Sequence, residues 1–397
     1  MKTKTKKPKK PKKASPKKDV RPPLPRPVVS HVWMRCGGRC AFPGCNTPLW
    51  KDLLTNGRVN AALSAHIISW TPTGPRGDAV LSAKLAKDAS NLMLLCHPHH
   101  ELVDNDVAQF TVEVLRNYKE LHEKRIETLT GIDEARRTTV IFLQAAVGPH
   151  SDPMRLDHAR LAATEAGHYP REQVIAIDLT AFGSRDHEPD YWSKATRLIS
   201  ARLETSLSSL RHAEAVDHVS VFGIASIPLL IHLGRELGDK IDAQVYNLHR
   251  NPKGWRWPRD ARRFKGFSTL PEEPVNADAS EVGLLVSVTS NVQRDHVRKV
   301  LPEPAPLFEL RADAPALELL RHPDELAAFS QAFRDAMERI HNETPRAMRI
   351  HLFTAVPVAC AVEIGRALLA KIHAPIQVYD FHRARNGFVP AIEIRTN

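Results

Sequence analysis

Four residues that could hold a metal ion occur as two short-spaced pairs. Cys40 and Cys45 lie five positions apart, and Cys96 is followed three positions later by His99. Thiolates and imidazoles at such spacings are common ligands of tetrahedral zinc, and four protein ligands leave the ion no open coordination position. The spacing therefore predicts a structural zinc site at these four residues.

Two further cysteines need a separate interpretation. Cys36 precedes Cys40 by about one helical turn, in a segment that has the pattern of a helix. We interpret it as a bystander, with replacement of one of the four ligands as the alternative. Cys360 lies in an apolar run far along the chain and is expected in a core.

Three polar residues near these pairs are not needed by zinc: His66, Asn91 and His100. Residues 63–68 and 91–96 have the pattern of strands, and a helix is expected to start near Pro98, since proline is favoured in a first turn. A His, then an Asn, then a His around a β-hairpin and a following helix is the order found in HNH nucleases. Residues 39–106 therefore resemble the zinc-stabilised members of that ββα-metal family.

The resemblance implies a role for each of these side chains. His66 would be the general base that activates water, since a neutral imidazole can accept a proton near physiological pH. His100 would bind a catalytic Mg²⁺ or Mn²⁺, with the remaining positions open to water and phosphate oxygens. Asn91 would fix the loop geometry through its amide or coordinate the metal directly. Arg76 would pair with a backbone phosphate, because its planar fork matches that group.

One position departs from the family pattern. Many members carry Asp or His immediately before the general base as a metal ligand, and here that residue is Ala65. The metal would then be held more loosely, or another carboxylate would contribute. Asp104 is the candidate, because it lies four residues after His100 on one face of the expected helix.

Length and composition indicate a soluble chain of two or three domains. Of its 397 residues, 42% are hydrophobic and 25% are charged, which is an ordinary balance for globular proteins. No apolar run reaches the roughly 18 residues that span a bilayer, and no hydrophobic segment follows the basic N-terminus. Cysteines with zinc-like spacing suit a reducing compartment. We therefore expect a cytoplasmic protein with no membrane partner.

The net positive charge is confined to one end of the chain. Residues 1–27 carry ten Lys and two Arg against one Asp, which equals the +11 of the whole chain, so residues 28–397 are balanced. A segment of Lys, Pro and Ser with so little apolar surface is expected to be disordered. It would either anchor the protein to nucleic acid phosphates or add solubility. The balanced charge of residues 28–397 therefore gives no indication of nucleic acid binding.

The rest of the sequence divides into a nuclease domain, residues 28–131, and an α/β region, residues 132–397. The nuclease domain is expected to end with a long helix over residues 111–129. In the α/β region, short apolar runs alternate with amphipathic helices, as in parallel α/β folds. Residues 132–160 have the pattern of a connection that includes a strand at 139–147.

The α/β region contains an internal duplication. Most matches share an offset of 131 residues, and those after residue 243 are two residues further apart. The matching residues are Phe222 with Phe353, Gly234-Arg235 with Gly365-Arg366, Lys240-Ile241 with Lys371-Ile372, Gln244-Val245-Tyr246 with Gln377-Val378-Tyr379, and His249-Arg250 with His382-Arg383. We expect two Rossmann-like halves, about 160–260 and 275–397, with a strand at 282–289 in the place of a strand at 174–180.

A second family resemblance rests on this duplication. Trp255-Arg256-Trp257-Pro258 follows the first half, and residues 283–289 open the second. A duplicated α/β domain with these segments resembles the SAVED domain, which is similar to the CARF sensors of CRISPR systems. HNH fused to SAVED is the arrangement of an anti-phage CBASS effector. The resemblance implies a double-stranded DNA endonuclease with little sequence preference, activated when a cyclic oligonucleotide, with a dinucleotide favoured, binds SAVED and drives assembly into a dimer or tetramer.

Candidate residues for the messenger pocket follow from the expected sheets. Ligands of such sheets bind at the carboxyl ends of the strands, and a pocket made by two similar halves would suit a nearly two-fold ligand. The candidates are Thr180, Ser290 and Thr354, which follow or end strands, together with Trp255, Arg250 and Arg383. Trp255 would stack a base or pack in the core. The arginines would bind phosphate, or their repetition would reflect the fold.

Two other functions fit parts of the sequence. A restriction-type HNH nuclease would use its C-terminal part to read DNA, but a DNA-reading domain is usually basic and residues 28–397 are not. A non-catalytic binding protein would keep a degenerate metal module beside a nucleotide sensor, and Ala65 is the residue that favours it. The three functions differ in whether DNA is cut and whether a messenger is needed.

Overall fold

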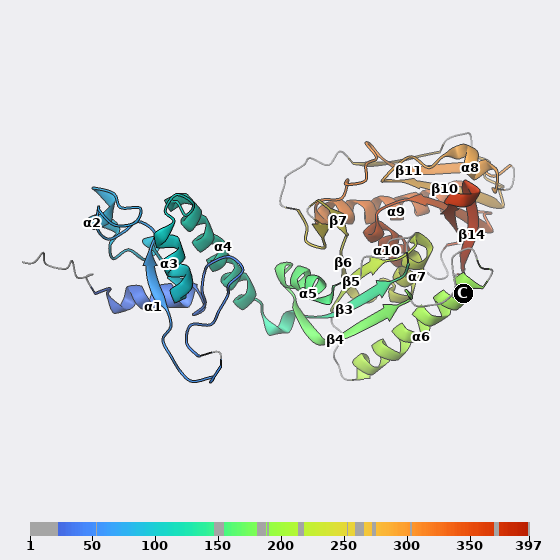
Figure 1. The fold of residues 1–397 in the computed structure, drawn as a ribbon. Helices are drawn as coiled ribbons and strands as arrows, with labels where there is room; N and C mark the ends of the chain where they lie inside the picture. The colour runs from blue at the N-terminus through green and yellow to red at the C-terminus, as the bar shows by residue number, and fades with distance from the viewer. Residues whose placement is uncertain are drawn as a thin grey trace, which may run out of the picture. The chain divides into compact units, whose positions relative to one another are not determined.

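The protein, described by a computed structural model, consists of two compact units, residues 1–131 and 132–397. The described residues are 23–52, 54–146, 155–180, 188, 190–212, 218–251, 253–258, 266–271, 275–301, 304–368 and 373–395. Most of the predicted basic tail and the repeated Lys371-Ile372 lie outside them. Figure 1 traces the helices and strands of each unit. Each unit has its own hydrophobic core.

The N-terminal unit is organised around an antiparallel hairpin followed by a helix. Its elements are α1 (Arg26–Arg35), β1 (Leu63–His66), α2 (Leu81–Leu85), the 3-10 helix η1 (Ala89–Asn91), β2 (Leu92–Leu95), α3 (His97–Asn105) and α4 (Val112–Thr130). In the hairpin His66 lies opposite Leu92. The predicted strands and both predicted helices are therefore confirmed, while α1 begins before the expected boundary at residue 28.

Local sequence explains where these elements begin and end. Pro98 occupies the first turn of α3, where its missing N–H is not needed. The hydroxyl of Thr111 accepts the N–H of Val114 and caps α4, which ends at Gly131. All four residues of β2 are fully buried, because α1 and α4 pack against the same core. The hairpin is thus held inside the unit, and its position fixes the side chains at its ends.

The first half of the C-terminal unit is a four-stranded parallel sheet. Its elements are η2 (Glu134–Arg136), β3 (Arg137–Gln144), α5 (Leu156–Glu165), β4 (Tyr169–Asp178), α6 (Tyr191–His212), β5 (His218–Ile224), α7 (Ile227–Leu237) and β6 (Asp242–Val245). The strand order is β4-β3-β5-β6, and all pairs are parallel. A small ribbon of β7 (His249–Arg250) and β8 (Lys253–Gly254) follows.

The second half repeats this order with an antiparallel strand at each edge. Its elements are β9 (Phe267–Pro271), β10 (Glu281–Ser287), α8 (Arg294–Arg298), β11 (Leu307–Ala312), α9 (Pro323–Glu343), β12 (Arg349–Ala355), α10 (Val358–Ala367), β13 (Ile376–His382), the 3-10 helix η3 (Arg383–Arg385) and β14 (Gly387–Ile394). The strand order is β14-β13-β12-β10-β11-β9, in which β10 to β13 are parallel. The predicted α/β duplication is therefore confirmed.

The structure corrects which strands correspond. Phe222 and Phe353 make β5 and β12 equivalent, and the strand that pairs with each of them on the side away from β6 and β13 is β3 and β10, respectively. The strand predicted at 282–289 therefore matches the one at 139–147, and the predicted equivalence with residues 174–180 is wrong. The first half begins at β3, not near residue 160. Parallel strands buried on both faces have similar apolar sequences, so their order in a sheet is not visible from composition.

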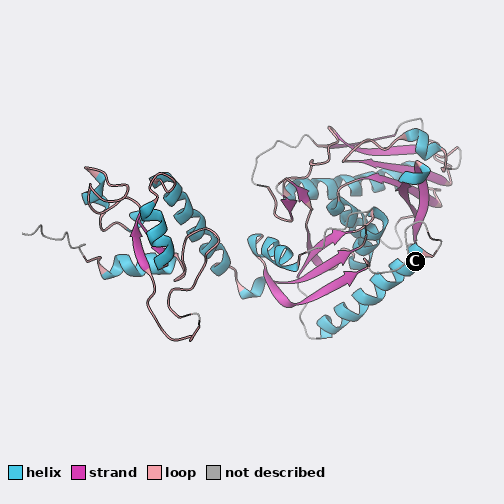
Figure 2. Cartoon of the chain, viewed as in Figure 1, coloured by secondary structure: helices cyan, strands magenta, loops and turns pink. Residues whose placement is uncertain are grey.

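The two halves share one core, in which α7 packs against α10. This core draws on one face of each sheet and on α6, α7, α9 and α10, whereas α5 and α8 cover the opposite faces. Figure 2 shows helices between the two groups of strands. A Cβ on Gly234 would lie 1.9 Å from the carbonyl oxygen of Val362, and one on Gly365 would lie 1.9 Å from that of Ile231. The repeated glycines therefore let the two helix backbones touch.

The rings of the repeated aromatic residues also occupy matching places. Phe222 stacks on Tyr246 with ring centroids 4.4 Å apart, and Phe353 stacks on Tyr379 at the same distance. Across the halves, Arg366 donates to the carbonyl oxygen of Ile241 at 3.2 Å. The residues that recur in register thus build the same local packing twice.

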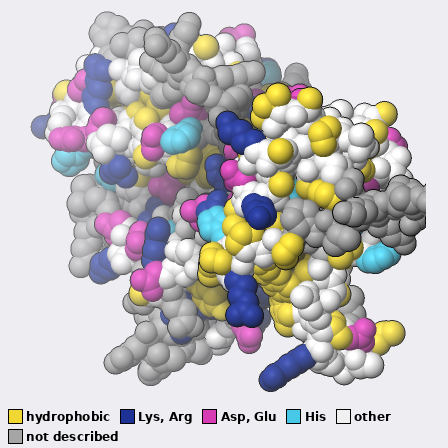
Figure 3. Space-filling view, turned by 90° about the vertical axis from the view of Figure 1, so that its left-hand side faces the viewer, with side chains coloured by type: hydrophobic (Ala, Val, Ile, Leu, Met, Phe, Trp, Pro, Cys, Tyr) yellow, Lys and Arg dark blue, Asp and Glu magenta, His cyan; other side chains and the backbone are white. Residues whose placement is uncertain are grey.

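One face of the described part of the surface shows how its charged side chains are distributed. On the face drawn in Figure 3, basic and acidic side chains of the described residues are interspersed. This agrees with the charge balance of residues 28–397. No described helix has the length and apolar character that crossing a membrane requires.

Candidate metal centres and ligand cavity

The four predicted zinc ligands converge in the N-terminal unit. Cys40, Cys45, Cys96 and His99 each offer one ligand atom, and these atoms all lie within 4.8 Å of one another. The sulfur of Cys96 is 3.0 Å from Nδ1 of His99, and that of Cys40 is 3.7 Å from it. Tetrahedral zinc with bonds of about 2.0 to 2.3 Å places neighbouring ligand atoms roughly 3.5 Å apart. The donor set and its spacing therefore fit such an ion.

The chemistry of the cluster also calls for a cation. Burial raises the pKa of the Cys40 thiol to about 12, so a thiolate at neutral pH needs a positive partner. The ring of Phe42 stacks on His99 at 4.1 Å and 8°, which holds the imidazole in place. Sequence reasoning did not identify Phe42, although it lies inside the first cysteine pair.

The remaining cysteines are not part of this cluster. Cys36 is fully buried, and its carbonyl oxygen accepts a hydrogen bond from Nε2 of His122 at 3.1 Å. Cys360 is fully buried in the core of the C-terminal unit. Both placements agree with the predictions.

His66 and Asn91 lie at the open end of the hairpin. Nε2 of His66 is 2.9 Å from the carbonyl oxygen of Ala86. A carbonyl only accepts, so Nε2 carries the proton and Nδ1 has the lone pair. Asn91 is 3% exposed, and its amide accepts from the N–H of Ile68 and donates to its carbonyl, both at 2.8 Å. Asn91 therefore fixes the loop after His66, and its coordination of a metal is not supported.

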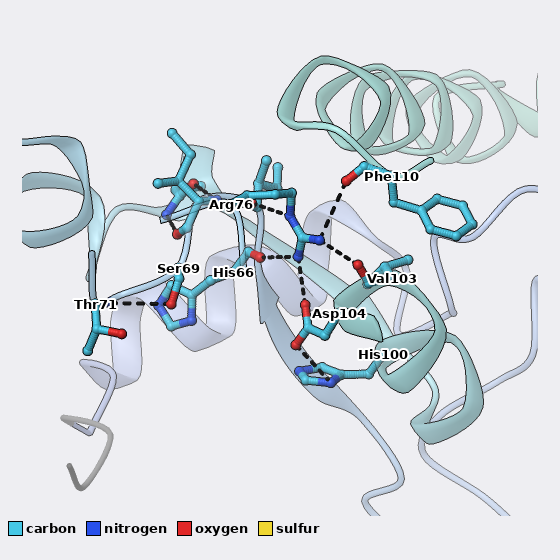
Figure 4. A network of polar contacts seen from close by, with 11 residues as sticks. His66, Ser69, Thr71, Arg76, His100, Val103, Asp104 and Phe110 are labelled. Carbon is cyan, nitrogen blue, oxygen red and sulfur yellow. Dashed lines mark hydrogen bonds and ion pairs between the residues drawn. The ribbon is translucent and has the colours of Figure 1, made fainter. Parts of the chain in front are cut away.

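Arg76 is a buried clamp, meaning that its side chain bonds separate segments of the chain together. This corrects the prediction that Arg76 contacts a phosphate. Its side chain is 4% exposed. Its guanidinium donates to the carbonyl oxygens of His66, Ile67, Val103 and Phe110. It also donates to Asp104 at 2.6 Å. These bonds join the strand that carries His66 to the helix that carries His100 (Figure 4).

His100 and Asp104 lie on one face of α3, as predicted. Nδ1 of His100 is 3.6 Å from Oδ2 of Asp104, whose other oxygen binds Arg76 (Figure 4). The side chain of His100 is 26% exposed, so it is accessible. Ala65 is 2% exposed and packs in the core. Asp104 is thus the carboxylate nearest to His100 among the candidates, and its orientation is set by Arg76.

The C-terminal unit contains a cavity of about 670 Å³ at the carboxyl ends of β10, β12 and β13. It is lined by Thr289, Ser290, Asn291, Val292, Gln293, His296, Pro315, Thr354, Ala355, Phe381 and Phe388. All of these belong to the second half, so this cavity is not the predicted pocket made by both halves. Among the described lining residues there is no Arg or Lys.

Two of the six predicted pocket residues, Ser290 and Thr354, line this cavity. Thr180 follows β4 and bonds to Asp178 instead. Arg250 and Arg383 are exposed, on β7 and η3, and neither is among the residues that line the cavity.

Trp255 belongs to the core, which was the second of its two predicted roles. It is 3% exposed, and its ring meets Phe222 edge-on at 5.3 Å. Stacking of a messenger base on it is therefore not supported. The aromatic residue that the sequence analysis missed is Phe381, which is 40% exposed at the end of β13 with His296 beside it at 5.4 Å. Its position near the end of a predicted strand was the available signal.

Comparison with protein families identifies this part of the chain. Residues 199–394 match the model of the SMODS-associated and fused to various effectors sensor domain. These residues are a SAVED domain. The match starts within α6 and includes the second sheet and its cavity. No curated protein matched the chain.

Solved structures similar to the chain are SAVED/CARF-domain receptors named Cap4. The receptor from Acinetobacter baumannii, determined with the cyclic trinucleotide 2′3′3′-cAAA, has 14% identity and a TM-score of 0.43, and the match covers 80% of this chain and 66% of that one. The receptor from Moraxella osloensis has 13% identity and a TM-score of 0.41, with coverage of 75% and 60%. The chain thus spans less than two thirds of the length of these receptors.

Proposed function

We propose that the chain is a DNA endonuclease of anti-phage defence that is controlled by a cyclic oligonucleotide. The SAVED domain supports the sensing role. The nuclease role rests on one observation: His66 at the end of the hairpin and the His100–Asp104 pair on the following helix are joined by Arg76 beside a Cys₃His cluster. Two histidines placed in this way suit phosphodiester hydrolysis, which needs a base and a divalent ion.

The proposed mechanism assigns one task to each side chain. Nδ1 of His66 takes the proton of the attacking water, since Nε2 already donates to Ala86. His100 and Asp104 would hold a divalent ion such as Mg²⁺ or Mn²⁺, and that ion would supply positive charge near the leaving oxygen. A zinc ion at the Cys₃His cluster would be structural, because Cys40, Cys45, Cys96 and His99 would fill its four positions and leave none for water.

The cavity at the end of the second sheet is the proposed messenger site. Phe381 offers a ring face for stacking a base, and Ser290 and Thr354 offer hydroxyls for phosphate oxygens. Because no described lining residue is Arg or Lys, the phosphate charges are left for groups outside this lining. A neighbouring subunit that covers the cavity would supply them.

Assembly gives the messenger its control over cleavage. A ligand shifts an equilibrium only by binding one state better than the other. A site completed by a second copy of the chain meets this condition, because the messenger binds the dimer or tetramer better than the single chain. In the assembled state the nuclease units would cut double-stranded DNA.

A cleavage assay tests the proposal directly. Full-length protein would be mixed with plasmid DNA and Mg²⁺, with and without a panel of cyclic dinucleotides and trinucleotides. We expect cutting only with one class of messenger. Cutting without any messenger would favour the restriction-type nuclease, and no cutting under any condition would favour the non-catalytic binding protein.

The role of His66 is tested by substitution. His66→Ala should lower cleavage by about 10²- to 10⁴-fold, the usual contribution of a general base, while messenger binding stays intact. His97→Ala is the matched control, because His97 lies on α3 with a side chain that is 70% exposed and pairs only with Glu101 among the contacts described. Equal loss in both variants, or loss of messenger binding with His66→Ala, would count against the assignment.

A further inference from the structure

The loop that lines the messenger cavity is tied to a buried polar pair. Residues 288–293 connect β10 to α8, and most of them face the cavity. The hydroxyl of Ser287 accepts the N–H of Val292 at 3.0 Å. The same hydroxyl donates to Oε1 of Glu309 at 2.7 Å. Ser287 is fully buried, and the side chain of Glu309 is 11% exposed.

The carboxylate decides which way the hydroxyl points. A serine hydroxyl has a single proton to donate, and a carboxylate can only accept. Because Glu309 takes that proton, the lone pairs of Ser287 remain for the N–H of Val292. The second oxygen of Glu309 lies 3.6 Å from Arg294, in the first turn of α8. The carboxylate therefore holds the loop at both of its ends.

A second anchor holds the other side of the loop. The N–H groups of Val288 and Thr289 both donate to the carbonyl oxygen of Ala355, at 2.9 and 2.8 Å. Ala355 ends β12, and both Thr289 and Ala355 line the cavity. The loop is thus held by the side chain of Ser287, through the N–H of Val292, and by the carbonyl oxygen of Ala355 at the end of β12.

The acid of this arrangement has no acidic counterpart at the matching strand position of the first half. Phe222 and Phe353 are equivalent, and their partners in the central strands are Phe142 and Leu285. Following the same register into the next strand makes Ala176 the counterpart of Glu309. By the same register the counterpart of Ser287 is Gln144. A buried acid that appears only in the half with the cavity is better explained by the site than by the fold.

We propose that Ser287 and Glu309 are positioning residues of the messenger site, which fix residues 288–293 in the shape that lines the cavity. The identity of the ligand in this inference rests on the proposed function. The hydrogen bonds that hold the loop do not depend on it. Preorganisation of a binding loop raises affinity by removing the cost of ordering it. Loss of one such hydrogen bond should weaken messenger binding roughly fivefold to tenfold.

Four variants of the full-length protein test this proposal. Ser287→Ala and Glu309→Ala remove the tie, while Glu309→Gln keeps an oxygen that can accept from Ser287. Ser330→Ala is the matched control, since Ser330 is buried and its hydroxyl donates to Glu363 at 2.9 Å, between helices and away from the cavity lining.

The first measurement is hydrogen–deuterium exchange without messenger. We expect faster exchange over residues 288–293 in Ser287→Ala and Glu309→Ala, and nearly unchanged exchange in Glu309→Gln and Ser330→Ala. Unchanged exchange in Ser287→Ala would overturn the proposal, and so would equal acceleration in the Ser330→Ala control. This arm does not depend on the identity of the messenger.

The second measurement is calorimetric titration with 3′3′-cyclic di-AMP, 3′3′-cyclic GMP-AMP and 2′3′3′-cAAA. For whichever probe binds the wild type, the two alanine variants should lose roughly fivefold to tenfold in affinity, and Glu309→Gln should restore most of it. Wild-type affinity in Ser287→Ala would refute the positioning role. If the exchange arm succeeds and no probe binds the wild type, the tie to the loop stands and the proposed function fails.

Discussion

The contact between α7 and α10 gives the sharpest prediction about the fold. In a helix interior, Gly→Ala normally stabilises a protein by about 1 kcal/mol. Gly365 lies within α10, but an added Cβ would be 1.9 Å from the carbonyl oxygen of Ile231 and 2.7 Å from the N–H nitrogen of Arg235. Both are backbone atoms and cannot rotate away. We therefore expect Gly365→Ala to be destabilising, the reverse of the usual sign.

The magnitude follows from what must move. Real contacts of a Cβ atom do not fall below 3.0 Å, so the two helices must separate by about 1 Å or distort. Overpacking of this kind costs about 1 to 3 kcal/mol. Separation also weakens the bond from Arg366 to the carbonyl oxygen of Ile241, which adds about 1 kcal/mol. A total near 3 kcal/mol lowers the Tm of a unit of this size by roughly 6 to 12 °C.

The assay is thermal unfolding of the full-length protein, followed for the transition of residues 132–397. Gly234→Ala should lower the free energy of unfolding by about the same amount, because its Cβ would clash with the carbonyl oxygen of Val362 in the same way. The double variant should cost less than the sum, since one separation of the helices relieves both clashes. Gly238→Ala is the comparison for backbone strain without a clash: nothing lies within 4 Å of its Cβ, but its φ of 63° and ψ of −165° lie in a region almost restricted to glycine, at a cost of about 1 to 3 kcal/mol. A Tm for Gly365→Ala at or above the wild-type value would refute the reasoning.

Three further predictions concern the Cys₃His cluster, the Arg76 clamp and the partly buried His218. Cys45→Ala should release zinc, measured by elemental analysis, and remove the melting transition of the N-terminal unit, whereas Cys36→Ala should keep the metal. Arg76→Lys should lower the stability of that unit and leave the salt dependence of DNA binding unchanged; loss of a phosphate contact would instead reduce the salt slope by about 1. Burial lowers the pKa of His218 to about 4, so between about pH 6.5 and 4 the unfolded state binds more protons. Stability should therefore fall as pH is lowered through that window and stay constant above it, and His218→Gln should flatten a plot of Tm against pH.

The sequence was most informative where the chemistry is local. Cys96 and His99 are brought together by the first turn of one helix, and their spacing predicts this directly. The hairpin and the helices of the N-terminal unit were predicted for the same reason, since periodicity and caps are short-range signals. The duplication could be found because Gly365 and its counterpart must permit a close approach of two backbones.

The predictions that the structure corrects, or decides between two alternatives, depend on contacts between distant segments. Arg76 has the chemistry of a phosphate ligand, but four carbonyl oxygens from three separate segments surround it. Trp255 was open between a stacking and a core role because only the tertiary fold brings it against Phe222. The order of parallel strands was also misjudged, since a central strand and its neighbours are equally apolar. In each case the sequence showed the chemical type of the residue or strand, but not which distant residues would pack against it.

The two halves of the duplication differ at the cavity, which explains why the cavity is not the symmetric pocket that the sequence predicted. Two kinds of feature recur in both halves: the glycine contact of α7 with α10, which joins the halves, and the Phe–Tyr stack, which lies on the outer face of each sheet. The features that do not recur lie at the carboxyl end of the second sheet, where Glu309 stands in place of Ala176. A buried acid reduces stability unless its partners are well placed, so its retention in one half needs a reason there. Holding the loop that lines the cavity is such a reason, and it supports the proposed messenger site within the second half.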